Sequence, residues 1–347
     1  MRETGIMQIT EQRLKEILSR AGKLRIAVLG DLMVDVYLIG SASRMSQEAP
    51  VPVLRVRKTE RRPGGAANVM RNITSFGAKA IAFGVIGEDA AGEELRRLLA
   101  ESGIDATRLA VDRKRKTTEK MRVMTANQQI VRVDFEDVFP VSRAVAAKME
   151  KQLAALIRER KIDAVIFEDY NKGLMDRETI QHLADLAREY GIITALDPHP
   201  GHPMEIQNLS VMTPNRSEAF GLAGLYCYDA VSPVEQDENL KHVASRILKT
   251  WNVESLLITL GPQGMALFRK RKALHAIPTK AKEVFDVSGA GDTVIALYTL
   301  CRAAGADDQE AAEIANRAAG IVVGKIGTAV TSPEELLAVF RQDGERK

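Results

Sequence analysis

Residues 286–300 read Asp-Val-Ser-Gly-Ala-Gly-Asp-Thr-Val-Ile-Ala-Leu-Tyr-Thr-Leu. Gly289 and Gly291 allow the backbone to turn tightly and to approach a ligand closely, and an apolar helical stretch runs from Thr293 to Leu300. The first N–H groups of a helix have no partner within it, and the helix dipole favours negative charge there. The stretch therefore predicts a phosphate-binding turn at the start of a helix.

Asp292 lies in this turn, where a carboxylate would repel a phosphate group. One interpretation is catalytic: the carboxylate accepts a proton from an attacking hydroxyl group. The other is structural: Asp292 caps the helix, and Gly-Ala-Gly is an ordinary turn. The chemistry of these residues alone leaves both open.

Outside this stretch, short apolar runs alternate with helical patterns. Residues 10–21 form an amphipathic pattern, followed by an apolar run over 24–29 that ends at Gly30. Further apolar runs occupy 81–86, 164–167, 192–196, 211–212 and 256–260, and helical patterns occupy 90–102, 142–160, 176–190, 236–250, 290–304, 308–325 and 333–341. This alternation predicts an α/β fold with a mostly parallel central sheet and helices on both faces.

Two stretches break that rhythm. Residues 51–57 and 119–134 alternate apolar and polar side chains, with a turn expected near Asn127–Gln128. Such alternation is typical of antiparallel strands with one exposed face. We expect one domain over residues 1–347, with a small β lid contributed by about 34–60 and 105–135.

Composition excludes several classes of protein. The chain has 347 residues, 45% of them hydrophobic, and a net charge of +3, which is too small to favour nucleic acid as the main partner. Cys227 and Cys301 form no CxxC pattern, so a disulfide framework and a cysteine-rich zinc site are excluded. The polar N-terminus has no signal-peptide core, and no apolar run approaches the ~20 residues that span a membrane. We therefore expect a cytoplasmic protein without a membrane partner.

Other motifs are absent or ambiguous. The sequence has neither a Gly-x4-Gly-Lys-Ser/Thr phosphate loop nor a Gly-x-Gly-x-x-Gly after the first strand. The basic runs 113–116 and 269–272 are either solvated turns or sites for phosphate or nucleic acid. His199 and His202 lie in a Pro-rich loop and are interpreted as loop residues, not metal ligands.

Asp-x-Ser-Gly-Ala-Gly-Asp resembles the C-terminal signature of the ribokinase-like (PfkB) sugar kinases, with Ser288 where Thr is usual. The resemblance implies a ribokinase-like fold and an ATP-dependent carbohydrate kinase. In that family Asp292 is the catalytic base, and the N–H groups of Gly289, Ala290 and Gly291 form the anion hole. The capping interpretation of Asp292 is then disfavoured.

The same resemblance extends to the sugar side of the site. Asp31 and Asp35 look like the family's sugar-hydroxyl site, since carboxylates accept hydrogen bonds from hydroxyl groups. Gly64, Gly65 and Asn68 resemble the N-terminal glycine motif, although the Gly-Gly to Asn spacing is one residue shorter than in many members. The alternatives are turn residues after a strand and a polar residue in the first turns of a helix.

Two further motifs resemble the nucleotide side of the site. Asn215-Arg-Ser-Glu218 is similar to the family's Asn-x-x-Glu element, in which the Glu helps organise Mg²⁺ through water; such a motif is also a good helix start. Residues 259–264 resemble a nucleotide-contacting turn, with an ordinary Gly-rich hairpin as the alternative, and contribute Thr259, Gly261 and Gly264.

A cation site is a further hypothesis from the resemblance. The hydroxyl of Ser288 and the carboxylate or backbone of Asp286 are candidates to hold a monovalent cation such as K⁺, as in some relatives. The cofactors implied are ATP and Mg²⁺, with K⁺ as this additional candidate.

Resemblance over five further stretches narrows the choice of sugar substrate. The stretches 30–35, 44–53, 63–68, 127–134 and 169–173 look like the heptose 7-phosphate kinases. Those enzymes phosphorylate the anomeric hydroxyl of D-glycero-β-D-manno-heptose 7-phosphate on the path to ADP- or GDP-heptose for bacterial surface polysaccharides. The alternatives are a kinase of the same family for another sugar, sugar phosphate or nucleoside, and a non-catalytic sensor. Since the chain ends at Lys347, we expect another protein to perform any following nucleotide transfer.

A phosphorylated sugar requires a cationic clamp away from Asp292. Lys172 is the preferred candidate because it lies in a matched motif with Asp169, and Arg122 and Arg132 are the others. For the two arginines the alternative is a surface position on a strand. We also expect a homodimer joined through the lid strands, because exposed strand edges are usually covered.

Overall fold

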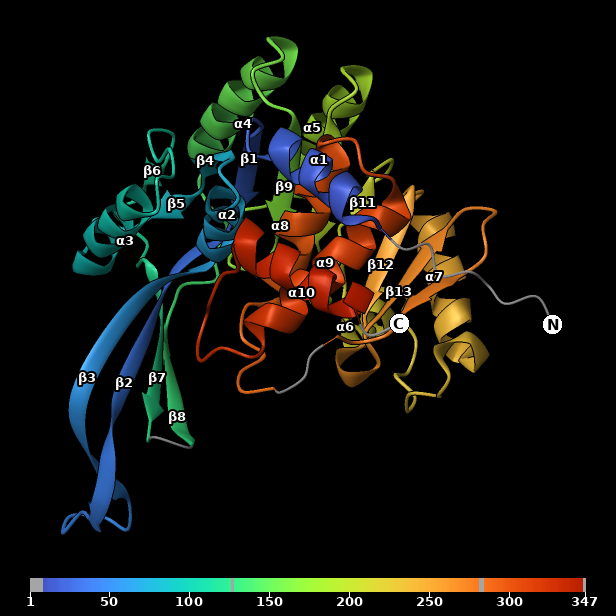
Figure 1. Ribbon diagram of the computed structural model, residues 1–347. Helices are drawn as coiled ribbons and strands as arrows, with labels where there is room; N and C mark the ends of the chain where they lie inside the picture. The colour runs from blue at the N-terminus through green and yellow to red at the C-terminus, as the bar shows by residue number, and fades with distance from the viewer. Residues whose placement is uncertain (1–8, 126–127, 281–283, 346–347) are drawn as a thin grey trace.

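The central sheet of the protein has eight strands in the order β14-β13-β12-β11-β10-β9-β1-β4 (Figure 1). The computed structural model describes residues 9–125, 128–280 and 284–345. The strands from β12 to β4 pair in parallel, while β13 and β14 add an antiparallel edge. The strands are β1 (Arg25–Gly30), β4 (Lys79–Phe83), β9 (Ala164–Glu168), β10 (Ile193–Asp197), β11 (Val211–Met212), β12 (Ser255–Thr259), β13 (Met265–Arg269) and β14 (His275–Ile277). The predicted mostly parallel sheet is confirmed.

Helices cover both faces of this sheet because its strands are apolar on both sides. In β1, Ile26 and Val28 enter one hydrophobic cluster, and Ala27 and Leu29 enter the other, since successive side chains point to opposite faces. The first cluster includes α1 (Glu11–Ala21), α2 (Ala66–Ser75), α3 (Ala90–Glu101), α8 (Ala290–Ala303), α9 (Asp308–Val322) and α10 (Pro333–Glu345). The second includes α4 (Arg143–Arg158), α5 (Arg177–Glu189), α6 (Arg216–Leu222) and α7 (Glu238–Thr250).

A second sheet projects from the main body as a lid (Figure 1). Its order is β3-β2-β7-β8, formed by β2 (Leu32–Met45), β3 (Pro52–Gly65), β7 (Thr118–Met124) and β8 (Gln129–Phe135). β2 and β3 are longer than the strand predicted over 51–57, and β2 begins one residue after β1 ends. Part of the turn expected near Asn127–Gln128 lies outside the described residues. A small pair, β5 (Val85–Ile86) and β6 (Ala110–Val111), lies between the two sheets in the sequence.

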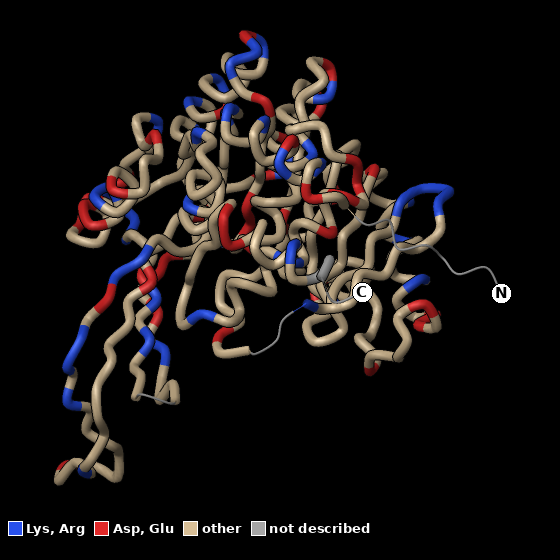
Figure 2. The backbone as a smooth tube through the Cα atoms, in the orientation of Figure 1, with Lys and Arg blue, Asp and Glu red and all other residues tan. Residues whose placement is uncertain are grey.

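The two basic runs differ in their surroundings. In the run 113–116, Arg115 is buried and donates hydrogen bonds to the carbonyl oxygens of Lys172, at 2.7 Å, and Phe139. This run therefore anchors the loop after β9. The run 269–272 is the turn between β13 and β14, and Figure 2 shows it as a basic loop on the main body, away from the lid.

No helix within the described ranges is long and apolar enough to cross a membrane. Cys227 is exposed, Cys301 is buried, and both are free thiols.

Candidate active site

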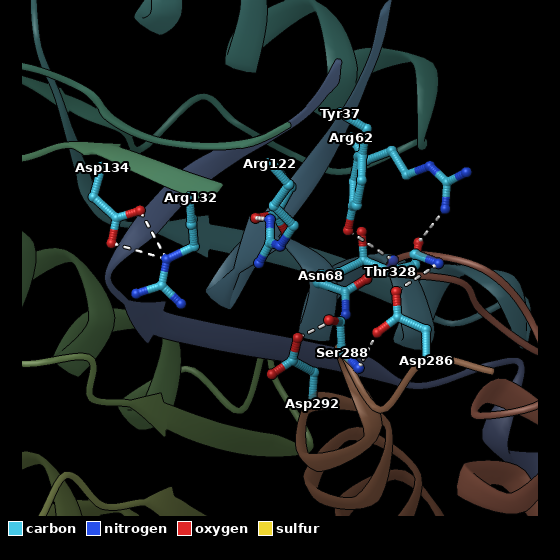
Figure 3. Close-up of polar contacts among 12 residues, drawn as sticks. Tyr37, Arg62, Asn68, Arg122, Arg132, Asp134, Asp286, Ser288, Asp292 and Thr328 are labelled. Carbon is cyan, nitrogen blue, oxygen red and sulfur yellow. Dashed lines mark hydrogen bonds and ion pairs between the residues drawn. The ribbon is translucent and has the colours of Figure 1, made fainter. Parts of the chain in front are cut away.

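The predicted base lies in the first turn of α8, where two side chains from distant elements contact it. Asp292 is 7% exposed. Its Oδ2 accepts a 2.6 Å hydrogen bond from the Nδ2 of Asn68 in α2 (Figure 3), and its Oδ1 accepts a 2.8 Å hydrogen bond from the hydroxyl of Tyr170, which follows β9. Asn68 and Asp292 were predicted for one site, and the structure brings them into contact. Tyr170 was not predicted.

Burial raises the pKa of Asp292, and the hydrogen bonds from Asn68 and Tyr170 oppose that rise. Both donors favour the ionised carboxylate, the form that can accept a proton. The Oδ1 of Asn68 is buried and has no hydrogen-bond partner among the described residues. The site thus offers a fixed carboxylate beside an unused amide oxygen, which suits an incoming hydroxyl group.

The glycine turn before α8 makes this contact possible. Gly289 has a φ of 78°, in the left-handed region, and a Cβ there would lie 2.6 Å from the Nδ2 of Asn68. Ala290 donates its N–H to the carbonyl of Val287 at 3.2 Å, so this predicted member of the anion hole already has a partner. The N–H group of Gly291, in the first turn of α8, donates to no other described residue. It is therefore available to donate a hydrogen bond to an anion.

Asp286 joins two loops next to the turn. Its Oδ1 accepts a hydrogen bond from the N–H of Ser288 at 2.9 Å, and its Oδ2 accepts one from the N–H of Gly327 at 3.0 Å (Figure 3). Both oxygens of this candidate cation ligand are therefore used to hold the backbone of the site together.

On the sugar side, the two predicted carboxylates differ in how they are engaged. Asp31 accepts the N–H groups of Tyr170 and Lys172 at 3.0 and 3.1 Å on one oxygen, and burial raises its pKa to about 6. It therefore shapes the loop after β9. Asp35 faces the lid strand β7, and its Oδ1 is 2.5 Å from Arg122.

The glycine motif fits closely around these carboxylates. A Cβ at Gly64 would lie 2.6 Å from the Oδ2 of Asp35, and one at Gly65 would lie 2.7 Å from the carbonyl oxygen of Asp31. The missing side chains let β3 approach both carboxylates. Negative charge on Asp35 also raises the pKa of Asp292, which places the two carboxylates in one electrostatic site.

The predicted clamp residues already have carboxylate partners. Lys172 pairs with Glu136 at 2.8 Å, and Arg132 pairs with Asp134 at 2.9 Å, the latter drawn in Figure 3. Asp169 accepts the N–H of Asn171 and pairs with Nδ1 of His202 at 2.8 Å. These contacts give Asp169 and His202 a role in fixing the loop.

The nucleotide motifs surround a mostly apolar cavity of about 370 Å³ between the β12–β13 turn and the helices α8 and α9. Thr259, Gly261 and Gly264 line it, together with Val284, Val287, Ala290, Gly291, Val294, Asn316, Ala319, Gly320 and Val323. Asn215 pairs with Thr259 through a β-bridge, and Asn215 and Glu218 cap each other's backbone at the start of α6. The Asn-x-x-Glu motif therefore starts a helix, as one interpretation predicted. It also lies beside the cavity, because Asn215 is bridged to Thr259, which lines it.

Two further carboxylates lie at the ends of parallel strands. Glu168 ends β9 and Asp197 ends β10, in register with each other, and burial raises the pKa of both well above the usual range. The pKa of Glu218 is also raised by burial. The signal that could have predicted Glu168, Tyr170 and Asp197 is their position, because ligands of open α/β sheets bind at the carboxyl ends of the strands.

The carboxylates of Asp197 and Glu218 fit a divalent metal ion whose coordination is completed by the phosphates of a ligand. No group of three or more His, Cys, Asp or Glu side chains among the described residues could hold a metal ion by itself. Mg²⁺ commonly takes one or two carboxylates and completes its shell with phosphates and water. Asp197 lies near the anion turn, since its Oδ2 would be 3.8 Å from a Cβ at Gly291, and it is one such carboxylate; Glu218 is another.

Comparison with known proteins identifies relatives of this chain. A model of the pfkB family of carbohydrate kinases matches residues 23–335. Bifunctional protein HldE of Helicobacter pylori strain J99 is 40% identical over 320 residues, covering 92% of this chain and 66% of that protein. The protein of the same name from Desulfatibacillum aliphaticivorans is 41% identical over 319 residues, covering 90% and 62%. The chain thus spans less than two thirds of the length of these curated relatives.

Solved structures with the same fold include two kinases. Arabidopsis thaliana ribokinase, solved with ribose and ATP, has a TM-score of 0.67 at 18% identity and covers 92% of this chain and 99% of its own. Escherichia coli phosphofructokinase-2, solved with potassium, has a TM-score of 0.71 at 20% identity, with the same coverage. At these identities the likeness shows the ribokinase-like fold.

Proposed function

This chain belongs to the pfkB family of carbohydrate kinases, and we propose that its acceptor is D-glycero-β-D-manno-heptose 7-phosphate. The reaction transfers the γ-phosphoryl group of ATP to the anomeric hydroxyl and gives the 1,7-bisphosphate, a step toward ADP- or GDP-heptose. Membership of a kinase family implies ATP and a divalent metal. The choice of sugar rests on the motif resemblance over residues 30–173 and on identity near 40% to relatives named HldE.

The observation that carries the proposal is the buried carboxylate of Asp292, fixed by Asn68 and Tyr170 at the start of α8. In the mechanism, Asp292 takes the proton of the acceptor hydroxyl as that oxygen attacks the γ-phosphorus of ATP. The bond from phosphorus to the bridging oxygen breaks, and ADP leaves with the electron pair. In this proposal Asn68 and Tyr170 keep the carboxylate ionised and oriented, and Asp35 accepts hydrogen bonds from ring hydroxyls.

The phosphates are expected at the glycine turn. The start of α8, with the N–H of Gly291, stabilises negative charge on the transferring group, and the apolar cavity beside it receives the base of the nucleotide. Asp197 and Glu218 would hold Mg²⁺, Glu218 through water, and the ion would neutralise charge on the β- and γ-phosphates. Asp286 and Ser288 are the residues that would hold K⁺.

We further propose that residues 1–347 form one kinase domain acting in the cytoplasm as a homodimer. The lid supports the dimer, because β8 exposes Val131, Val133 and Phe135 on one face and is the last strand of the four-stranded sheet, with no strand beyond it among the described residues. Closing the lid over the acceptor would exclude water and limit hydrolysis of ATP.

A substrate panel tests the proposal. Purified protein with MgATP is assayed for ADP release on addition of heptose 7-phosphate, heptose, fructose 6-phosphate, fructose, ribose or a nucleoside. We expect the highest kcat/KM with heptose 7-phosphate. A higher value with another acceptor would replace the proposed sugar, and ATP consumption that no sugar stimulates would contradict a kinase of this class.

A further inference from the structure

The inner face of the lid carries more cations than its carboxylates neutralise. Lys120 and Arg122 lie two residues apart on β7, and Lys120 is in register with Asp35 on β2 and Asp134 on β8. Residues that pair across strands share a face of the sheet. The charges of Asp35 and Lys120 both act on the carboxyl of Asp292 and shift its pKa in opposite directions, so this face is turned toward the proposed base. Figure 3 shows Arg122 on this side of the lid.

The neighbouring cations are already paired with carboxylates. Arg122 pairs with Asp35 at 2.5 Å, Arg132 with Asp134 at 2.9 Å, and Lys172 with Glu136 at 2.8 Å. Lys120, in contrast, has no hydrogen bond or ion pair with any residue in the ranges 9–125, 128–280 and 284–345. Its Nζ lies 5.4 Å from the ring centroid of Tyr170.

An ammonium in this position is only partly compensated. Lys120 is half-buried, and burial, followed by the positive charges of Lys172 and Arg132, lowers its pKa. The negative charges of Asp134 and Asp35 offset this only in part. Removing a charged group from water costs free energy unless an opposite charge or hydrogen bonds replace the lost hydration. The ring of Tyr170 supplies part of this, as a cation–π contact. An anionic ligand would supply the rest.

The position of Lys120 relative to Asp292 and the nucleotide cavity indicates which anionic ligand it would bind. The same tyrosine ring that contacts the ammonium donates its hydroxyl to Asp292, so one aromatic side chain separates the cation from the proposed base. An anionic group bound to Lys120 therefore lies on the lid side of the site, away from the nucleotide cavity between α8 and α9.

We propose that Lys120 binds the phosphate ester of the acceptor and thereby sets the preference for phosphorylated over plain sugars. This inference rests on the proposed function, and it assigns the clamp to a residue other than Lys172. Lys172 would first have to give up its ion pair with Glu136, whereas Lys120 has no ion pair to break. The tyrosine ring also couples acceptor binding to the orientation of the base.

Steady-state kinetics of Lys120→Gln, Lys120→Arg and Lys172→Gln test the assignment. For each protein, kcat/KM is measured with heptose 7-phosphate and with heptose, and their ratio gives the preference for the phosphate. We expect Lys120→Gln to lower this ratio about 10- to 100-fold, the scale of a charge-assisted hydrogen bond, with the KM for ATP unchanged. Lys120→Arg should retain most of the preference, and Lys172→Gln should leave the ratio within about twofold of wild type.

Other outcomes would overturn the inference. A loss of preference in Lys172→Gln but not in Lys120→Gln assigns the clamp to Lys172. A rise in the KM for ATP in Lys120→Gln, with the ratio unchanged, assigns this lysine to the nucleotide phosphates. If another sugar phosphate is the better acceptor, the heptose assignment fails, and the same ratio is measured with that acceptor and its dephosphorylated form. If the best acceptor carries no phosphate, the inference fails as well.

Calorimetry distinguishes a failure of the proposed function from a failure of the Lys120 assignment. Titration of heptose 7-phosphate and heptose into wild type and Lys120→Gln compares affinities without turnover. A wild-type protein that binds the phosphorylated sugar through Lys120 but transfers no phosphoryl group would contradict the proposed function and support the inference. A wild-type protein that binds neither sugar would contradict both.

Discussion

Nδ2 of Asn68 lies 2.6 Å from Oδ2 of Asp292, although the two residues are 224 positions apart in the sequence. Asn68 comes from the helix that follows the lid strand β3, and Asp292 from the helix that follows the glycine turn. The contact therefore joins the sugar side of the site to the phosphate side. It also fixes the proposed base on one oxygen, while Tyr170 holds the other.

Asp292→Asn should bind MgATP and acceptor nearly normally and lose ~10²-fold or more in kcat, the usual scale for removing a general base. An amide in this position has nearly the same shape but cannot take the proton. Single-turnover kinetics measure the loss, and calorimetry with MgATP serves as the control. Turnover near that of wild type would show that another group is the base.

Tyr170→Phe should lower kcat and move the acid limb of the kcat/KM profile to higher pH. The reaction needs ionised Asp292, so activity falls as the pH drops through the pKa of this carboxyl, which burial already raises. The hydroxyl of Tyr170 favours the ionised form, so its removal should raise that pKa further. Tyr190→Phe, at the end of α5, is the matched control. If the acid limb does not move while thermal stability falls, Tyr170 is merely structural.

Gly289→Ala should abolish most activity because the new Cβ would lie 2.6 Å from the Nδ2 of Asn68. Gly224→Ala is a control for backbone strain, since Gly224 also has a positive φ, of 63°, and no atom lies within 4 Å of its Cβ position. Both variants should lose about 1–2 kcal/mol of unfolding free energy. Urea unfolding and kcat are measured for both, and equal losses of activity would refute the steric argument.

Val133→Asp should convert the proposed dimer to a monomer. Val133 is 39% exposed on the outer face of β8, and a charge there would be desolvated by a second lid. Sedimentation velocity at micromolar concentration measures the change. Val111→Asp, on β6 and 45% exposed, should leave the wild-type assembly intact. A wild-type protein that sediments as a monomer would remove the dimer from the proposal altogether.

Local sequence was sufficient for the elements and for several site residues. The apolar runs and helical patterns predict β1, β9, β10, β12 and most helices because each depends on periodicity within a short window. The turn at 286–292 predicts the start of α8 from its own glycines. By contrast, the bounds of β2 were not predicted, although most of this strand lies in the stretch 34–60 that was expected to contribute to the lid. Its outer half, from Gly40 to Met45, is partly or fully exposed and therefore lacks the continuous apolar pattern of a core strand.

Charge pairing across the site could not be predicted from the sequence. The pattern favoured Lys172 as the clamp. However, Lys172 pairs with Glu136, which follows β8, and Arg122 pairs with Asp35 on the neighbouring strand β2, and these partners follow from how the loop after β9 and the lid strands pack together. Shifting a strand by one residue would move every side chain of that strand to the other face of the sheet. The register must therefore be known before one can tell which lid cation has no carboxylate partner.

The sequence by itself determined the fold class and the glycine turn, because these depend on periodicity and backbone geometry within short windows. It identified Asp292 as the candidate base only through the resemblance of residues 286–292 to the ribokinase-like sugar kinases, since the residue chemistry also allowed a helix cap. Tertiary structure alone decided which groups surround that base. Asn68 and Tyr170 reach Asp292 from 224 and 122 positions away, and the ammonium of Lys120, on a strand of the lid, lies over the ring of Tyr170. Such contacts depend on how the parallel sheet, its covering helices and the lid converge at one edge, which no local pattern encodes.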